Sequence, residues 1–295
     1  MTKKETGEFL FRYYQKRVAS FLASLYKASI TCDDKDIHKA RVDVKKIFAM
    51  FYLFEMVLPR LFKKEEHYPT LKEIFDHSGK IREIQINLGL LEKYSEVGPD
   101  MVLFREFLVN EENKQTRIFI AGIKKFDEKT LKQTGKAIKS ITRGISRKKF
   151  LADAGIFIRS RTKRVAKYLK KENSPENIHK IRRHLKSMIA IANLSLTLKP
   201  DERLKLLIKN MDQAEGIIGE WHDKIVLLES IGHFRSDTGM KKKELLQKIP
   251  APLMDMEARI QEDCSGFMEQ IKPATEKVVT EVISYYAGSE PDEKK

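Results

Sequence analysis

The chain has 295 residues, of which 41% are hydrophobic, so it can bury the core of one large domain or two ordinary ones and is not a disordered polyelectrolyte. Its 57 Lys and Arg residues outnumber 42 Asp and Glu residues, and the net charge of +15 indicates anionic partners such as nucleic acid, an acidic membrane surface or a phosphate polymer. The chain has two cysteines, Cys32 and Cys264, whose spacing does not suggest a disulfide framework, and no uncharged stretch approaches the ~20 residues needed to cross a bilayer. Both features favour a cytoplasmic protein without a membrane span.

Apolar residues recur with a helical period through almost the whole chain, and Pro and Gly residues interrupt them. The predicted helices of the first half cover residues 5–30, 34–58, 70–96 and 101–127, and a connecting helix covers residues 128–142. Those of the second half cover residues 147–171, 175–198, 201–234 and 240–286, with a break near residues 249–252. No series of alternating strands is found, so the sequence predicts an all-α fold.

Four helices in each half suggest two tandem antiparallel four-helix bundles related by a pseudo-two-fold. The first bundle with its connecting helix is expected over residues 1–142 and the second over residues 143–288. Residues 289–295 are polar and are expected to form a disordered tail.

The most informative pattern is a repeat on the second helix of each half. Residues 37–45 recur 141 positions later as residues 178–186, and both copies read His-x-x-Arg-x-x-x-Lys. On a helix these three residues share one stripe, roughly 130° from the apolar stripe. Two rows of hydrogen-bond donors without acceptors indicate a receptor for a polyanion. The members of these rows are His38, Arg41, Lys45, His179, Arg182 and Lys186.

The repeat extends to the other helices. Residues 11–19 match residues 158–166 at an offset of 147, and each copy carries two cations one turn apart. These cations are either a second rail beside the His row or part of a solvated helix face, and they are Arg12, Lys16, Arg159 and Lys163.

A third repeated segment and the helix starts agree with the duplication. Residues 79–84 match residues 219–224 at an offset of 140, with the pattern Gly-x-x-basic-acidic. Asp33 and Ser174 occupy equivalent positions just before the His helices, and both are residues favoured at helix N-caps. The order of three motifs is therefore the same in both halves.

The duplicated His-x-x-Arg-x-x-x-Lys motif, followed each time by Gly-x-x-(Arg or His)-(Glu or Asp), resembles the CHAD domain over roughly residues 5–286. The resemblance implies two four-helix bundles and non-catalytic binding of inorganic polyphosphate in a basic groove or cavity between them. It assigns binding to both His rows and to Arg82, and Arg183 adds a cation where the first copy has Val42. The second copy carries His222-Asp223 where the family usually has Arg-Asp, and Glu83 and Asp223 are expected to buttress neighbouring cations.

Other interpretations stay open. A single histidine on a helix is usually a capped or core-edge residue, although duplication in register favours a ligand role for His38 and His179. A helical protein that binds nucleic acid electrostatically and a phosphohydrolase that uses one of these histidines are the alternatives. We expect no metal and no cofactor, a site that phosphate or sulfate can occupy, and association with polyphosphate granules. The patterns leave the oligomeric state and the preferred polymer length open.

Overall fold

The structure is a computed structural model and describes residues 2–94, 99–171, 174–237 and 251–287. Its elements follow the predicted order, and no strand occurs among these residues. They are α1 (Lys3–Thr31), α2 (Asp34–Val57), the 3-10 helix η1 (Lys64–Glu66), α3 (Pro69–Tyr94), α4 (Pro99–Lys125), α5 (Glu128–Thr142), α6 (Arg147–Leu169), α7 (Pro175–Leu198), α8 (Glu202–Asp237) and α10 (Ala251–Ala287). The predicted all-α fold is confirmed.

The last predicted helix, 240–286, is observed from Ala251 as α10. Its first residues 240–250, and with them part of the predicted break, lie outside the described residues. The predicted tail 289–295 lies outside them as well.

The starts of the two His helices show why these segments fold as they do. The Asp33 side chain accepts a hydrogen bond from the Lys35 backbone N–H at 2.8 Å, and Ser174 accepts one from the Asn177 N–H at 3.3 Å. Both predicted N-caps are therefore confirmed, and each satisfies an N–H that has no partner within its helix. Cys32 ends α1 in the left-handed region with φ 51°, which turns the chain directly into α2.

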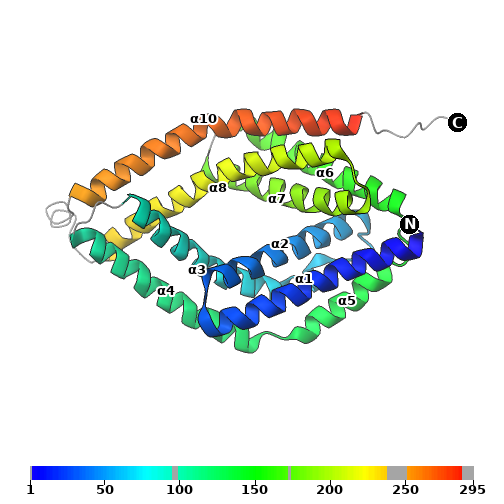
Figure 1. The fold of residues 1–295 in the computed structure, drawn as a ribbon, viewed down its shortest axis with the longest axis horizontal. Helices are drawn as coiled ribbons and strands as arrows, with labels where there is room; N and C mark the ends of the chain where they lie inside the picture. Colours follow the sequence, from blue (N-terminus) through cyan, green and yellow to red (C-terminus); the bar gives the residue numbers. More distant parts are fainter. Residues whose placement is uncertain (1, 95–98, 172–173, 238–250, 288–295) are drawn as a thin grey trace.

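The helices pack in the same order in each half. In the first half α1 packs on α2, α2 on α3, and α3 on α4; in the second half α6 packs on α7, α7 on α8, and α8 on α10. Between the halves, α2 packs on α7 and α3 on α8. Figure 1 shows α1, α4 and α5 along one long side of the molecule and α10 along the other, with α2, α3, α7 and α8 between them. This arrangement fits two tandem bundles.

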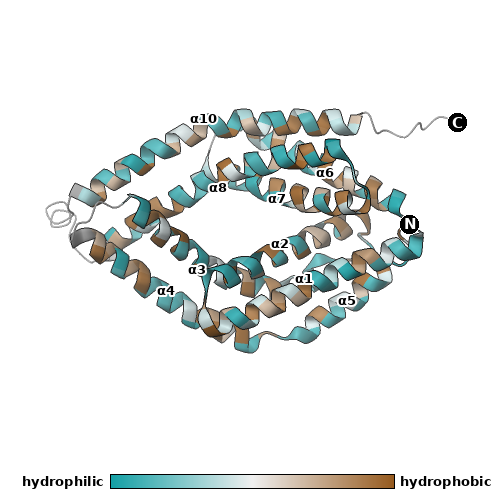
Figure 2. Cartoon of the chain, in the orientation of Figure 1, coloured by the Kyte–Doolittle hydropathy of each residue, from teal (hydrophilic) through white to brown (hydrophobic). Residues whose placement is uncertain are grey.

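Apolar side chains from both halves form the core. Figure 2 shows hydrophobic and hydrophilic residues alternating around individual helices, as expected where one face of a helix is buried. Phe51 of α2, Met188 of α7 and Trp221 of α8 are each at most 3% exposed and belong to one hydrophobic cluster. The two halves therefore share a continuous core, which fixes α2 against α7.

Candidate functional site

The apolar stripe predicted for the first His helix anchors that helix in the core. Ala40, Val44, Ile47 and Phe51 are between 0% and 4% exposed. The His row lies on another face of the same helix, where His38 is exposed and Arg41 and Lys45 are half-buried. The second His helix has the same division, since Ile181 and Leu185 are buried while His179 is exposed. Burial of the apolar stripe in the core therefore leaves the His row of each helix on an accessible face.

The two rows act on each other electrostatically. Burial lowers the pKa of Lys45 to about 7, and the charges of Lys186, Arg41 and Arg182 contribute to the shift against the opposing charge of Glu215. The pKa of His38 is lowered by burial and then by Lys45, Lys186 and Arg41. Cations of α7 therefore lie close enough to α2 to disfavour its positive charges. We call the six residues of the two rows the cation cluster.

Arg41 is held by groups of α3. Its Nη1 donates hydrogen bonds to the backbone carbonyl of Phe75 and, at 3.3 Å, to Ser78 Oγ. The guanidinium carbon lies 4.1 Å from the centroid of the Phe75 ring, in a cation–π contact. Burial lowers the pKa of Arg41 to about 10, so the group remains charged at neutral pH. Its position and its charge are both fixed before any ligand arrives.

Arg182 is held differently, by a carboxylate of α8. Its Nε donates to Glu215 Oε1 at 2.8 Å, and Lys186 Nζ lies 2.9 Å from the same oxygen. Burial opposes ionisation of Glu215, but Lys186 and Arg182 together outweigh it and lower the pKa of this carboxyl group. Glu215 therefore stays ionised and neutralises part of the second row.

Glu215 and Phe75 occupy equivalent positions, because the third repeated segment has an offset of 140. In the first half the residue under Arg41 and Lys45 is an aromatic ring, which carries no charge. In the second half it is a carboxylate bound to two cations. The second row therefore has a directly bound carboxylate at a position where the first row has an uncharged ring. Sequence reasoning missed both residues, although the offset of 140 pairs them.

The repeated glycines explain how the arginines fit. A Cβ atom on Gly79 would lie 2.8 Å from Arg41 Nη1, and one on Gly219 would lie 2.9 Å from Arg182 Nη2. Each guanidinium thus lies directly over the glycine of a neighbouring helix. The close contact that these glycines allow is with an arginine side chain.

The basic positions of the third repeated segment, Arg82 and His222, offer no free positive charge to the cation cluster. Arg82 forms an ion pair with Asp34 at the start of α2, and Asp223 also acts on its pKa, which burial lowers. Burial lowers the pKa of His222 to about 4, with further contributions from Arg182, His179 and other cations, so this side chain is neutral at pH 7. Its ring centroid lies 5.2 Å from that of His179.

The two acidic residues of this motif have the expected neighbours. Glu83 acts electrostatically on Arg41, and Asp223 is influenced by Arg182 and Lys186. For both carboxyl groups burial raises the pKa and the nearby cations oppose it. These electrostatic couplings place both carboxyl groups near cations of the two rows.

The first-helix cations lie apart from the cluster. Arg12 has a 79% exposed side chain and pairs with Glu8 of its own helix at 3.9 Å, and Lys16 and Lys163 are exposed. Arg159 lies over the Tyr286 ring of α10, 5.5 Å from its centroid. None of these residues is among the charges that shift the pKa of Lys45, His179 or His222. The structure does not bring them together with the His rows.

Arg183, in contrast, lies close to the second row, because after burial its charge is the largest influence that lowers the pKa of His179. It is exposed beside the second row. Its role as an additional binding cation stays a prediction.

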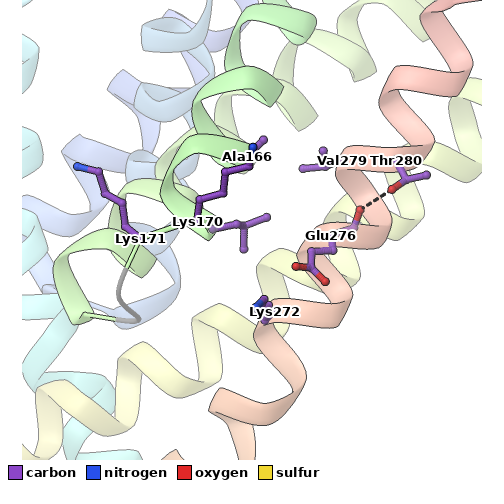
Figure 3. A pocket seen from close by; sticks show the side chains of 8 residues that line it. Ala166, Lys170, Lys171, Lys272, Glu276, Val279 and Thr280 are labelled. Carbon is purple, nitrogen blue, oxygen red and sulfur yellow. Dashed lines mark hydrogen bonds between the residues drawn. The ribbon is translucent and has the colours of Figure 1, made fainter.

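A separate hollow of about 670 Å³ lies between the end of α6 and α10. Figure 3 shows Lys170, Lys171 and Lys272 around it, with Glu276 on the α10 side. It shares no residue with the cation cluster.

Across the four described ranges, no group of three or more His, Cys, Asp or Glu side chains is arranged to hold a metal ion. Within the same ranges no helix combines the length and hydrophobicity required of a membrane span.

Fold and site together define an all-helical protein with two similar halves and cations of both halves gathered at their junction. The sequence model of the CHAD domain family matches residues 12–231, so the chain belongs to this family. A crystal structure of the CHAD domain from the plant Ricinus communis has the same fold, with a TM-score of 0.68 at 12% sequence identity. The similarity covers 92% of this chain and 91% of the plant chain. No curated protein matched the chain.

Proposed function

We propose that the protein binds inorganic polyphosphate at the cation cluster and does not catalyse its cleavage. The observation that carries the proposal is the convergence of two cation rows from different halves, with Glu215 as the carboxylate bound between Arg182 and Lys186. The general association of the CHAD family with polyphosphate binding or metabolism supports the same ligand.

The chemistry of the side chains suits a repeating phosphate chain. The planar fork of Arg41 or Arg182 can hold two phosphate oxygens at once, whereas Lys45 and Lys186 act as mobile point charges. A single phosphate cannot neutralise both rows, but a polymer with about one charge per unit can contact several cations in succession. Binding would also relieve the mutual repulsion that lowers the pKa of Lys45.

The surroundings of the histidines favour binding over catalysis. Burial is the main reason that the pKa values of the His38 and His179 imidazoles are lowered. The charges that add to this effect all belong to lysine or arginine side chains. A catalytic histidine is usually oriented by a carboxylate or carbonyl group and has a pKa near the working pH. Phosphate release from polyphosphate in the presence of Mg²⁺ or Mn²⁺ would contradict the non-catalytic part of the proposal.

A calorimetric titration of the full chain with long-chain polyphosphate tests the proposed ligand. We expect binding at low salt, with an affinity that falls linearly on a double logarithmic plot as salt is raised, because bound counterions are released. Single-stranded RNA and duplex DNA of equal charge serve as competitors. Polyphosphate should displace them readily, and the reverse displacement should be poor. Absence of binding at low salt would refute the proposal, and tighter binding of nucleic acid would favour the nucleic-acid alternative.

Glu215→Gln is expected to tighten polyphosphate binding by about tenfold, because Arg182 and Lys186 lose a competing anion. The reciprocal variant Phe75→Glu places a carboxylate at the equivalent position under the first row and should weaken binding. Fluorescence anisotropy with labelled polyphosphate measures both. Opposite signs for the two variants support competition, whereas loss of affinity in both would mean that Glu215 only supports the arginine.

The double variant Gly79→Ala/Gly219→Ala is expected to weaken binding several-fold while leaving the melting temperature unchanged or slightly higher. Each new Cβ displaces a guanidinium, and alanine in a helix interior is favoured over glycine by about 0.5–1 kcal/mol. Gly89→Ala and Gly216→Ala on the same two helices are matched controls, because a Cβ there meets nothing within 4 Å. Equal affinity of the double variant and the controls would show that the arginine positions do not matter.

Polyphosphate binding of this kind would bring the protein to polyphosphate granules in the cytoplasm. A fluorescent fusion that stays diffuse in cells with visible granules would argue against that location.

A further inference from the structure

The interface between the first two helices carries different charges in the two halves of the molecule. In the first half Arg17 of α1 donates to Asp43 of α2, with 3.0 Å between Nη1 and Oδ1. The repeat offsets of 147 and 141 place Arg164 of α6 and His184 of α7 at the equivalent positions. The acidic member of the pair is therefore replaced by a histidine in the second half, and the arginine loses its carboxylate.

Two more positions change in the same direction. Tyr14 is buried and its hydroxyl donates to the Leu131 carbonyl at 3.0 Å, whereas its equivalent in the second half is Arg161. Val42 has Arg183 as its equivalent. The second half thus gains two arginines and a histidine where the first half has two uncharged residues and an acid. Mere solvation of a charged helix face does not account for this gain of positive charge, because the interface is otherwise repeated in the two halves.

These side chains gather around one imidazole. Burial, together with the charges of Arg161, Arg164 and Arg183, lowers the pKa of His184 to about 4. The His184 ring stacks on Tyr168, with 5.9 Å between centroids. Because its pKa is this low, His184 is neutral at pH 7 and adds no fourth positive charge.

Arg161 is positioned by aromatic rings but is not neutralised. The Arg161 guanidinium carbon lies 4.8 Å from the Phe157 ring centroid and 5.4 Å from that of Tyr52. Stacking of this kind holds the guanidinium plane and leaves its edge N–H groups for an oxygen ligand. Among the ion pairs of the described residues, none involves Arg161, Arg164 or Arg183. Glu55 acts only weakly on Arg161 and is bound to Lys64 at 2.7 Å.

We propose that Arg161, Arg164 and Arg183, here named the arginine cluster, form a second phosphate-binding site, which a polyphosphate chain held by the cation cluster reaches through Arg183. Arg183 links the two places, because its charge acts on His179 of the cation cluster and on His184, the imidazole beside the arginine cluster. This inference rests on the proposed function. Its consequence is a preference for long chains, since a chain of a few phosphates can occupy the cation cluster alone.

His184→Asp tests the site by restoring the charge pair of the first half. The new carboxylate should pair with Arg164 as Asp43 pairs with Arg17, so affinity for long-chain polyphosphate is expected to fall about tenfold. Affinity for tripolyphosphate should stay unchanged. Gln133→Glu on the exposed side of α5 is the charge-matched control. Arg164→Gln, at an exposed position, gives the same test should the histidine variant fail to fold.

Calorimetric titrations with both ligands separate the outcomes. Loss of affinity for the long chain alone supports the second site. Unchanged affinity for the long chain in both variants overturns it while leaving the proposed function intact. Equal losses for long and short chains would also overturn it, because the arginine cluster would then not be separate. Failure of the parent protein to bind long-chain polyphosphate would overturn the proposed function itself, and with it this extension.

Discussion

Joint replacement of Arg41 and Arg182 by glutamine is expected to weaken binding of long-chain polyphosphate by about 100-fold or more at low salt. Each arginine contributes hydrogen bonds to a charged ligand, which are worth about 1.5–3 kcal/mol apiece, and every 1.4 kcal/mol is a factor of ten. Both guanidinium groups are already fixed, over Gly79 and Gly219 respectively, so little side-chain entropy is lost when a ligand binds. Calorimetry gives the affinities.

The matched control for this variant is Lys132→Gln/Lys136→Gln, which removes two positive charges from the exposed face of α5. Its affinity should fall only slightly and its dependence on salt should stay nearly parallel to that of the parent. Equal losses in the two double variants would mean that diffuse charge, and not a site, binds the polymer. Thermal unfolding of the arginine variant is needed beside the titration, because Arg41 also donates to groups of α3.

Polyphosphate binding is expected to weaken as the pH rises through 7 and to take up protons between about pH 7 and 8. The pKa of Lys45 is about 7 in the free protein, so half of the side chains are neutral at that pH. A bound polyanion favours the charged form and raises this pKa, which requires proton uptake. Calorimetry in buffers with different ionisation enthalpies measures the number of protons.

Lys45→Arg should bind at pH 8 as well as at pH 6, because an arginine stays charged in this range. Lys45→Met should bind weakly at both values. The stability of the free protein has the opposite dependence on pH. The unfolded chain, with the ordinary lysine pKa near 10.5, binds more protons than the folded protein above pH 7, so folding stability from this group rises with pH over that window. A parent protein whose affinity is constant from pH 6 to 8 would contradict the assignment.

The helices could be predicted closely because local signals mark most of their ends. Asp33, Ser174 and Pro175 begin the His helices in the sequence and in the structure, and proline or glycine residues separate most of the others. Pro273 shows the limit of such rules, since it lies inside α10. Tertiary packing of that long helix against α8 and α6 outweighs the local preference of one residue.

The site was predicted in outline but not in its balance of charge. Repetition identified the two rows, and their shared position follows from the packing of α2 on α7. Glu215 could not be assigned from spacing alone, because only the fold shows that this carboxylate reaches Arg182 and Lys186. The repeat marked Arg159 but not Arg161, although Arg161 is the one that contacts α2, through Tyr52. A charge count cannot tell which face of α6 meets the neighbouring helix.

The packing of α2 on α7 also has an energetic consequence. Docking of α2 on α7 brings the cations of both rows together, and burial with the charges of Lys186 and Arg182 makes Lys45 less basic. Repulsion between the rows therefore opposes the contact between the halves, while the shared hydrophobic core drives it. A multivalent anion that bridges the rows would offset this repulsion and so hold the two halves more firmly together.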